Sequence, residues 1–268
     1  MTAEKTTTAF GWRIYGLAVM ALGAVSLVLG DFDPGQPVPQ GFPARTTLAY
    51  AVAALMVVAG AAILWRKTSA WAAAALTAYY ALIVVLLMNG RLLLAHHAQD
   101  GAYEVPAEQI AITAGALIIY ATSAQLNPTL AARLIRLGQL AFGVCALQFG
   151  AAHFFYMNLT APLIPHWLPP SQVFWGYATG VGFLAAGLAL LTGVKARLAA
   201  VLLTAMLAIF TIMVHLPILI AAPSIHFNWT ELTANLAILA AAWVVADSLA
   251  RPGLPTNETT PQIHADSQ

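Results

Sequence analysis

Charged side chains are scarce in this sequence. Of its 268 residues, 11 are Lys or Arg and 10 are Asp or Glu, so charged residues make up 8% of the chain. An ordinary soluble domain carries roughly 25%. Hydrophobic residues reach 60%, and the mean hydropathy is +0.79. This composition excludes a water-soluble fold, and the lack of any basic stripe argues against a nucleic-acid partner.

Cysteine is almost absent as well. Cys145 is the single thiol, and it lies within an apolar run. One cysteine excludes a disulfide framework and a CxxC motif, so we expect it to be a small core residue. Lys5 and Arg13 precede the first apolar run as in a signal peptide, but no small-x-small cleavage motif precedes Asp31. We therefore expect a retained first helix.

Long apolar runs are what the sequence has in abundance. Each is about the length needed to cross a hydrocarbon layer of ~30 Å as a helix. The runs fall at about 12–30, 46–65, 69–89, 108–126, 134–156, 173–192, 196–220 and 229–249. The sequence therefore predicts an all-α, polytopic transmembrane helix bundle of eight spans.

The few basic residues are distributed unevenly between the two sides that these spans define. Lys and Arg in short loops are retained in the cytoplasm during membrane insertion. Only Arg45 and Arg91 fall on one predicted side. The other side holds Lys5, Arg13, Arg66, Lys67, Arg133, Arg136, Lys195, Arg197 and Arg251. This pattern predicts a multi-pass protein of the bacterial inner membrane with both termini in the cytoplasm, the tail 252–268 being polar and disordered.

The two halves of the sequence resemble each other at a shift of about 126 residues. The proline-rich segment 38–43 then lies over segment 164–169, and Gly60 lies over Gly187. Because four spans return the chain to its starting side, the two copies share one orientation and the repeat is parallel. We expect a first four-helix repeat over residues 1–130 and a second over 131–251.

The second half carries a series of recognisable motifs. In order they are Phe149-Gly150-Ala151-Ala152-His153-Phe154, Ile164-Pro165-His166-Trp167-Leu168-Pro169, Trp175-Gly176-Tyr177, a basic turn with Lys195 and Arg197, and Val214-His215. The series resembles the DoxX-like membrane protein family, whose superfamily includes the surfeit-locus cargo receptors. The resemblance covers about residues 134–250 well and 12–126 weakly, since the positions over His153 and His215 lie near Leu27 and Gly90. It implies a four-helix bundle per repeat and, as for some relatives, a quinone-linked oxidoreductase system.

Four histidines fall on the predicted non-cytoplasmic side of the second half. His153 follows Arg136 by 17 residues and His215 follows Arg197 by 18, which places both imidazoles roughly 25–27 Å from the cytoplasmic boundary. His166 in the next loop and His226 before the last span share that side. Neutral imidazoles suit zinc, copper, iron or haem, so these four residues are candidate metal ligands. The alternative is that His153 and His215 each form a hydrogen bond with a neighbouring helix or extend to the level of the lipid headgroups.

Glu231 lies near the start of the last predicted span. An ionisable residue inside a membrane is costly and marks a candidate proton-handling or ligand site, with Asn235 one turn further along. The alternative is helix capping, since Asn228 precedes Glu231 by three residues, and Glu108 occupies a similar place in the first half.

A quinone headgroup is a second candidate ligand. Its carbonyls need hydrogen-bond donors and its ring needs flat apolar walls. We group His153, His215 and Glu231 as candidate catalytic residues. The candidate cofactor-binding residues are Gln148, His166, Trp167, Trp175, His226 and Asn235. The alternative for the aromatic residues is an interfacial belt.

His96, His97, Asp100 and Glu104 are expected to lie in a solvated loop of the first half, with divalent-cation binding as the alternative. For the whole chain, three functions stay open. The first is a membrane redox component that binds a quinone, a metal or a small substrate at the non-cytoplasmic face of the second repeat. The others are a non-catalytic subunit that binds a partner or cargo through its outer loops, and a small-solute transporter.

Overall fold

The computed structural model describes residues 9–250, which form helices and no strand. Eight helical segments are long and apolar enough to cross a membrane. They are α1 (Gly11–Leu29), α2 (Arg45–Ile63), the continuous α3, η1 and α4 (Ser69–Ala78, Tyr79–Asn89, Gly90–His96), α5 (Glu104–Ser123) after the short η2 (Asp100–Tyr103), α6 (Pro128–Phe155), α8 (Gln172–Thr192), the continuous α9, η4 and α10 (Ala196–Phe210, Thr211–His215, Leu216–Ala221), and α11 (His226–Ser248). The predicted all-α bundle of eight spans is confirmed; the tail 252–268 lies outside the described residues.

Three of the predicted boundaries differ from those of the structure by several residues. The third span runs on to His96, and α5 begins at Glu104 rather than at 108, so both residues belong to helices. The fifth span begins six residues earlier than predicted, at Pro128. There the Asn127 side chain accepts a hydrogen bond from the Thr129 amide, and the proline at the first helical position has no amide to satisfy. Apolar runs fix where a helix crosses the lipid, whereas such local signals fix where it ends.

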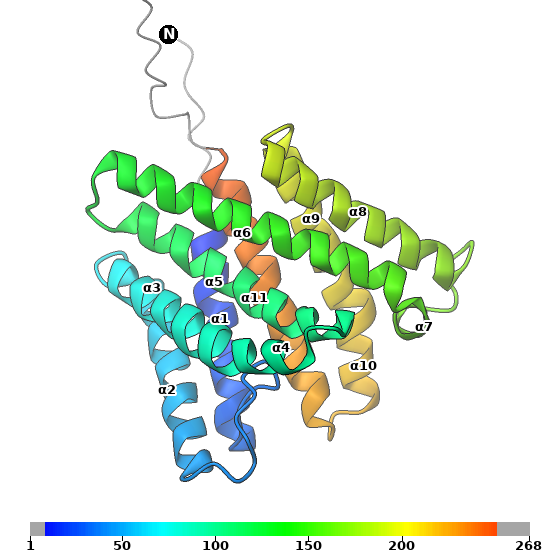
Figure 1. Ribbon diagram of the computed structural model, residues 1–268, viewed down its shortest axis with the longest axis horizontal. Coiled ribbons are helices and arrows are strands. Elements are labelled where there is room, and N and C mark those ends of the chain that lie inside the picture. Colours follow the sequence, from blue (N-terminus) through cyan, green and yellow to red (C-terminus); the bar gives the residue numbers. More distant parts are fainter. Residues whose placement is uncertain (1–8, 251–268) are drawn as a thin grey trace, which may run out of the picture.

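The helices pack as a closed ring, and α11 contacts both α5 and α6 across it. In order around the ring, α1 contacts α2, α2 contacts α3, α3 contacts α5, and α5 contacts α6. The second half repeats this order, from α6 through α8 and α9 to α11, which returns to α1. In Figure 1, α2 and α3 lie on one side, α8 and α9 lie on the other, and α5 and α11 cross at the centre. The two halves therefore share one packing order.

Glycines set the distance between the first two helices of each half. A methyl group built on Gly16 would lie 2.7 Å from the carbonyl oxygen of Gly60, and one built on Gly187 would lie 2.8 Å from that of Gly143. Gly23 meets the Ala53 carbonyl at 2.7 Å in the same way, and Gly150 meets that of Gly180 at 2.9 Å. Each of these residues in the second half lies 127 positions after its counterpart in the first. Small residues of this kind let transmembrane helices approach closely.

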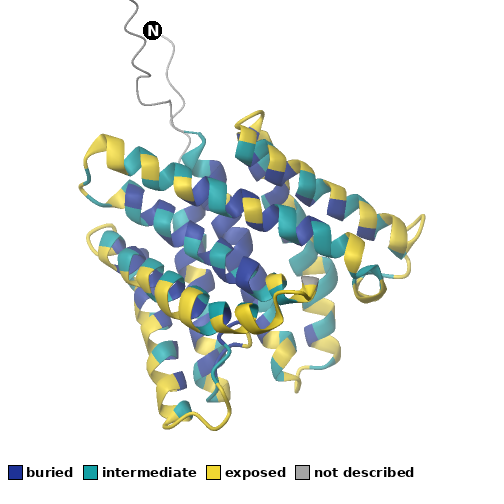
Figure 2. Cartoon of the chain, viewed as in Figure 1, coloured by how far each residue is buried: buried dark blue, intermediate teal, exposed yellow. Residues whose placement is uncertain are grey.

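The fourth helices of the two halves, α5 and α11, meet each other at the centre. A methyl group on Gly115 would lie 2.9 Å from the Cβ atom of Ala241, which lies 126 positions later. The contact joins two residues at the same offset along the two halves. Figure 2 shows buried residues concentrated along these central helices and exposed residues on the outer ones.

The third helix of each half contains a π-helical segment at the same place. η1 ends at Asn89 and η4 ends at His215, which makes these two residues counterparts at a distance of 126. A π turn accommodates an extra residue in a helix. The number of positions between corresponding residues of the two halves is 127 before these segments and 126 after them. The longer π-helical segment in the first half, which holds one extra residue, accounts for this change of register.

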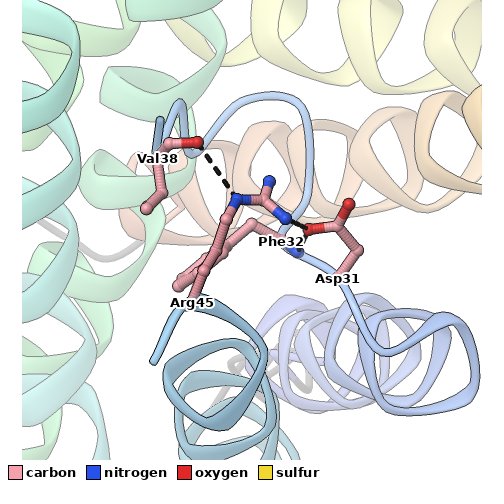
Figure 3. A network of polar contacts seen from close by, with 4 residues as sticks. All are labelled: Asp31, Phe32, Val38 and Arg45. Atoms are coloured by element: carbon pink, nitrogen blue, oxygen red, sulfur yellow. Dashed lines mark hydrogen bonds and ion pairs between the residues drawn. The ribbon is translucent and has the colours of Figure 1, made fainter. Parts of the chain in front are cut away.

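The connections alternate between two faces. The loops 30–44, 97–103, 156–171 and 222–225 join the helices on one side, which we call the proline-loop face. Both ends of the described chain meet on the opposite face, where the Gly11 amide donates a hydrogen bond of 2.8 Å to Asp247 Oδ2. On the proline-loop face, the guanidinium of Arg45 pairs with Asp31, lies over the Phe32 ring and donates to the Val38 carbonyl at 3.3 Å (Figure 3). These contacts hold loop 30–44 against the bundle.

Candidate functional site

The second half encloses a cavity of about 920 Å³. Its walls come from the ends of α6 and α8 nearest the proline-loop face, from α9 and η4, and from the first turns of α11. The connection after α6, with α7 (Met157–Thr160) and η3 (Ala161–Leu163), covers one side, and the first turns of α5 reach it from the first half. Most of the lining is aliphatic or aromatic, and the polar groups within it are few.

His153 lines the cavity from α6. Its Nδ1 atom lies 2.7 Å from the carbonyl oxygen of Phe149, and a carbonyl can only accept, so Nδ1 carries a proton. In the neutral ring the Nε2 atom is then a hydrogen-bond acceptor. The imidazole packs against the ring of Phe183 at a centroid distance of 5.3 Å and stacks on Phe210 at 6.5 Å. The hydrogen bond of His153 therefore lies within its own helix, whereas the alternative interpretation expected a bond to a neighbouring helix.

His215 lines the same cavity from the end of η4. Asn235 on α11 fixes this segment, since its Nδ2 atom donates to Thr211 Oγ1 at 2.7 Å and to the Leu207 carbonyl at 3.3 Å. Both Asn235 hydrogens are thereby used within the protein, whereas the described residues supply no hydrogen-bond partner for His215. The imidazole of His215 is therefore free to bind a ligand.

Three carboxyl groups line one end of the cavity. Glu231 comes from α11, and Glu104 and Glu108 come from α5 in the first half. Glu104 Oε1 accepts a hydrogen bond of 2.9 Å from Gln148. Glu108 lies close enough to Glu231 and Glu104 for their charges to interact. The cavity thus combines apolar walls with a protonatable end that both halves build.

The capping interpretation of Glu231 and Glu108 is wrong. α11 begins at His226 and α5 at Glu104, so both residues lie beyond the first few positions of their helices. Neither helix has a side-chain hydrogen bond at its N-cap. Asn228 instead donates to the carbonyl oxygen of Ala222 at 3.0 Å.

A fourth carboxyl group, that of Asp33, lies in loop 30–44 near Glu108 and Glu231. It is 6% exposed; its Oδ1 atom accepts from the Gly35 amide at 2.8 Å, and its buried Oδ2 atom has no hydrogen-bond partner among the described residues. Burial raises the pKa of Asp33 to about 6, and the hydrogen bond from Gly35 offsets part of that rise.

The structure brings together part of the predicted site. His153, His215, Glu231, Trp175 and Asn235 all line the cavity, and Gln148 joins it through Glu104. The Trp175 indole donates to the Pro169 carbonyl at 2.8 Å, which anchors the start of α8. Cys145 is buried, as expected of a core residue.

Three predicted residues do not line the cavity: His166, Trp167 and His226. Trp167 is 71% exposed. Within residues 9–250, no three His, Cys, Asp or Glu side chains are placed to hold a metal ion, so the four histidines form no common ligand set. His166 lies in the loop 156–171 and His226 at the start of α11.

Sequence reasoning missed Glu104 and Glu108 as members of this site. Glu104 was expected in a solvated loop, yet it lies in α5 and lines the cavity. The available signal was the spacing of four between two carboxylates in an otherwise apolar helix, which puts both on one helix face. Phe183 and Met206 also line the cavity. Nothing in the sequence distinguishes them from the many other apolar residues of the spans.

Comparison with known proteins adds no assignment to this geometry. No protein-family model matches the chain, and no curated protein and no solved structure matches it. The resemblance to the DoxX-like family therefore stays a prediction from the motifs of the second half.

Proposed function

We propose that this integral membrane protein is a component of a membrane redox system that binds a quinone or quinol headgroup in the cavity of its second half. The observation that carries the proposal is the cavity itself: about 920 Å³ of mostly apolar lining, with two histidines and three carboxyl groups at hand. This volume lies in the range of roughly 300–1,000 Å³ typical of small-molecule sites. The resemblance to a family with quinone-linked members supports the same proposal.

The position of the cavity suits a molecule that arrives from the lipid. Leu202 and Ile209 on α9 line the cavity and are 60% and 53% exposed, so the cavity reaches the outer flank of the bundle. An apolar tail can lie along this flank while the headgroup occupies the interior. A charged, water-soluble substrate would have to cross the same apolar surface at a high cost in free energy.

Conversion between a quinone and a quinol takes up or releases two protons together with two electrons. In the proposal, His153 and His215 exchange protons with the headgroup oxygens, because imidazoles change protonation near neutral pH. Glu231, with Glu108 and Glu104, passes protons between the imidazoles and the proline-loop face. A redox partner supplies or accepts the electrons.

The proposed sidedness follows from the basic residues. Seven of the nine Lys and Arg residues within 9–250 lie toward the face opposite the proline loops, so we assign the proline-loop face to the non-cytoplasmic side of a bacterial inner membrane. Reporter fusions test this assignment. A fusion in the turn after α8 should report the cytoplasm and one in the turn before α11 the opposite compartment; the same compartment for both would overturn it.

Binding can be tested by titrating the purified protein in nanodiscs with a short-chain benzoquinone. We expect one saturable site per chain, and about fivefold weaker binding in a His153→Ala/His215→Ala variant, since the variant removes the hydrogen bond that His215 can donate to a quinone oxygen, worth about 1 kcal/mol. His97→Ala is the matched control, because that imidazole is exposed and its only side-chain hydrogen bond within the described residues is to Leu94 in its own turn. Lack of saturable binding, or equal binding in the double variant, would overturn the proposal.

A further inference from the structure

In the first half, a segment of loop 30–44 is inserted between the helices. Gln36 is 2% exposed; its Oε1 atom accepts from the Tyr79 hydroxyl at 2.8 Å, and its Nε2 atom lies 3.6 Å from the Met56 sulfur. The neighbouring Gly35 carbonyl accepts a hydrogen bond of 3.0 Å from Asn89 Nδ2. A methyl group on Gly35 would lie 2.1 Å from Gln109 Nε2, so that amide packs directly on the segment. We call residues 33–36 the plug.

The residues that hold the plug have counterparts that line the cavity. Met56 and Tyr79 correspond to Phe183 and Met206 at the register of 127 that the glycine crossings define. Beyond the π-helical segments the register is 126, and there the remaining two residues, Asn89 and Gln109, correspond to His215 and Asn235.

All four counterparts line the cavity: Phe183, Met206, His215 and Asn235. The plug therefore fills, in the first half, the place that the second half leaves open.

We propose that the plug occupies in the first half the position that the ligand occupies in the second half. The ligand then places a planar apolar group between Phe183 and Met206 and accepts a hydrogen bond from His215 on a carbonyl oxygen. This inference rests on the proposed function and adds the orientation of the headgroup and the residues that select it.

The differences between the two sets of contacts define the chemistry. In the first half, the planar carboxamide of Gln36 lies between a thioether and a phenol that donates to it. Phe183 and Met206 offer no such donor, so the group between them needs none and is held by ring and sulfur contacts. His215 replaces Asn89, which donates to a carbonyl, and it can donate in the same way. The combination favours a neutral conjugated carbonyl compound.

The Asn235 side chain takes a supporting role in this arrangement. Both of its amide hydrogens are used within the protein, on Thr211 and on the Leu207 carbonyl. It therefore holds the π-helical segment that presents His215, as a positioning residue rather than a ligand contact.

The test compares two probes, a short-chain benzoquinone and the 1,4-dimethoxybenzene of the same substitution, which keeps the ring but has no carbonyl. We expect the wild-type protein to bind the quinone about fivefold more tightly, as the loss of one hydrogen bond worth about 1 kcal/mol implies. His215→Leu should bind both probes equally, and His215→Gln should restore the preference because an amide can donate. Phe183→Ala should weaken the binding of both probes by a similar factor and leave the preference unchanged.

The outcomes separate this inference from the proposed function. If the wild-type protein binds neither probe, the proposed function fails. If it binds the quinone but His215→Leu keeps the preference for the carbonyl, only the present inference fails. Should His215→Leu not fold in detergent, His215→Gln and Phe183→Ala decide the question, since a loss of carbonyl preference in Phe183→Ala also contradicts the proposed orientation.

Discussion

The two halves of this protein have the same helix packing but different interiors. Gly16 and Gly60 cross in the first half as Gly143 and Gly187 cross in the second, and each third helix contains a π-helical segment. The first half fills its interior with residues 33–36 of its own chain, whereas the second half keeps a cavity of about 920 Å³. An unfilled apolar cavity costs stability, so the open half is the one in which a function has to be sought.

The comparison also shows how the filled half contributes to the open one. Glu104 and Glu108 reach the cavity from α5, because α5 packs against α6 at the junction of the halves. Asp33, in the plug, lies close to Glu108 and Glu231. The first half therefore stabilises the bundle and supplies protonatable groups to the cavity of the second.

The largest expected effect concerns the shared glycine crossings. Gly60→Val and Gly187→Val each force side-chain atoms against a backbone carbonyl that lies 2.6 Å or 2.8 Å from the position of the first added carbon. We expect each variant to lose about 3 kcal/mol of unfolding free energy in detergent, and the two losses to be similar. Gly41→Ala is the control, because nothing lies within 4 Å of its added methyl group. A large loss in only one half would contradict the equivalence of the crossings.

The next effect concerns the buried carboxyl group of the plug. The pKa of Asp33 is raised to about 6 from an ordinary value of 3.8, so the folded state binds a proton more tightly than the unfolded state. Stability therefore falls as the pH rises from about 4 through 6, and Asp33→Asn removes this loss. We expect Asp33→Asn to be about 3 kcal/mol more stable than wild type at pH 8 and nearly equal to it at pH 4. Denaturant unfolding at both pH values measures the difference, and an equal difference at both would contradict the assignment.

Gln36→Ala should have a smaller effect, specific to the first half. It removes a buried side chain and leaves the Tyr79 hydroxyl without its acceptor. The expected loss is about 1.5 kcal/mol, measured by thermal unfolding. Tyr79→Phe/Gln36→Ala should cost less than the sum of the two single changes, because the two side chains share one hydrogen bond. Affinity for a quinone in the second half should stay unchanged, and a loss of affinity would show that the plug acts on the cavity.

The smallest effect is expected for the ion pair between Arg45 and Asp31, which helps to hold loop 30–44 and which we call the clasp. Arg45 and Asp31 are partly exposed, so their ion pair is screened by water and contributes about 1 kcal/mol or less. Arg45→Ala should lower the unfolding temperature slightly and increase the protease sensitivity of loop 30–44. Arg91→Ala is the control on the same face. Equal protease sensitivity of the two variants would mean that the plug holds the loop without the clasp.

Much of the fold could be predicted because each span is a local property. A helix in lipid satisfies its backbone hydrogen bonds internally and needs only an apolar run of sufficient length, which the sequence shows directly. His153, His215 and Glu231 were accessible for the same reason, since depth follows from the rise per residue along each helix. The four histidines that were predicted as metal ligands do not form a common ligand set, for a different reason. His166 and His226 share a side of the bundle with His153 and His215, but side chains on one side need not converge.

The sequence by itself determined the number of spans, the even return of the chain to its starting side and the depth of the two cavity histidines. Only the tertiary structure decided which half is hollow, because the insertion of residues 33–36 depends on contacts with Met56, Tyr79 and Asn89 in helices far along the chain. It also decided that Glu104 and Glu108 face the second half. The hydrophobicity that makes a segment span the membrane is a local property of that segment and can be read from the sequence. Whether the space between the helices is filled depends on side chains that come into contact only after the helices have packed.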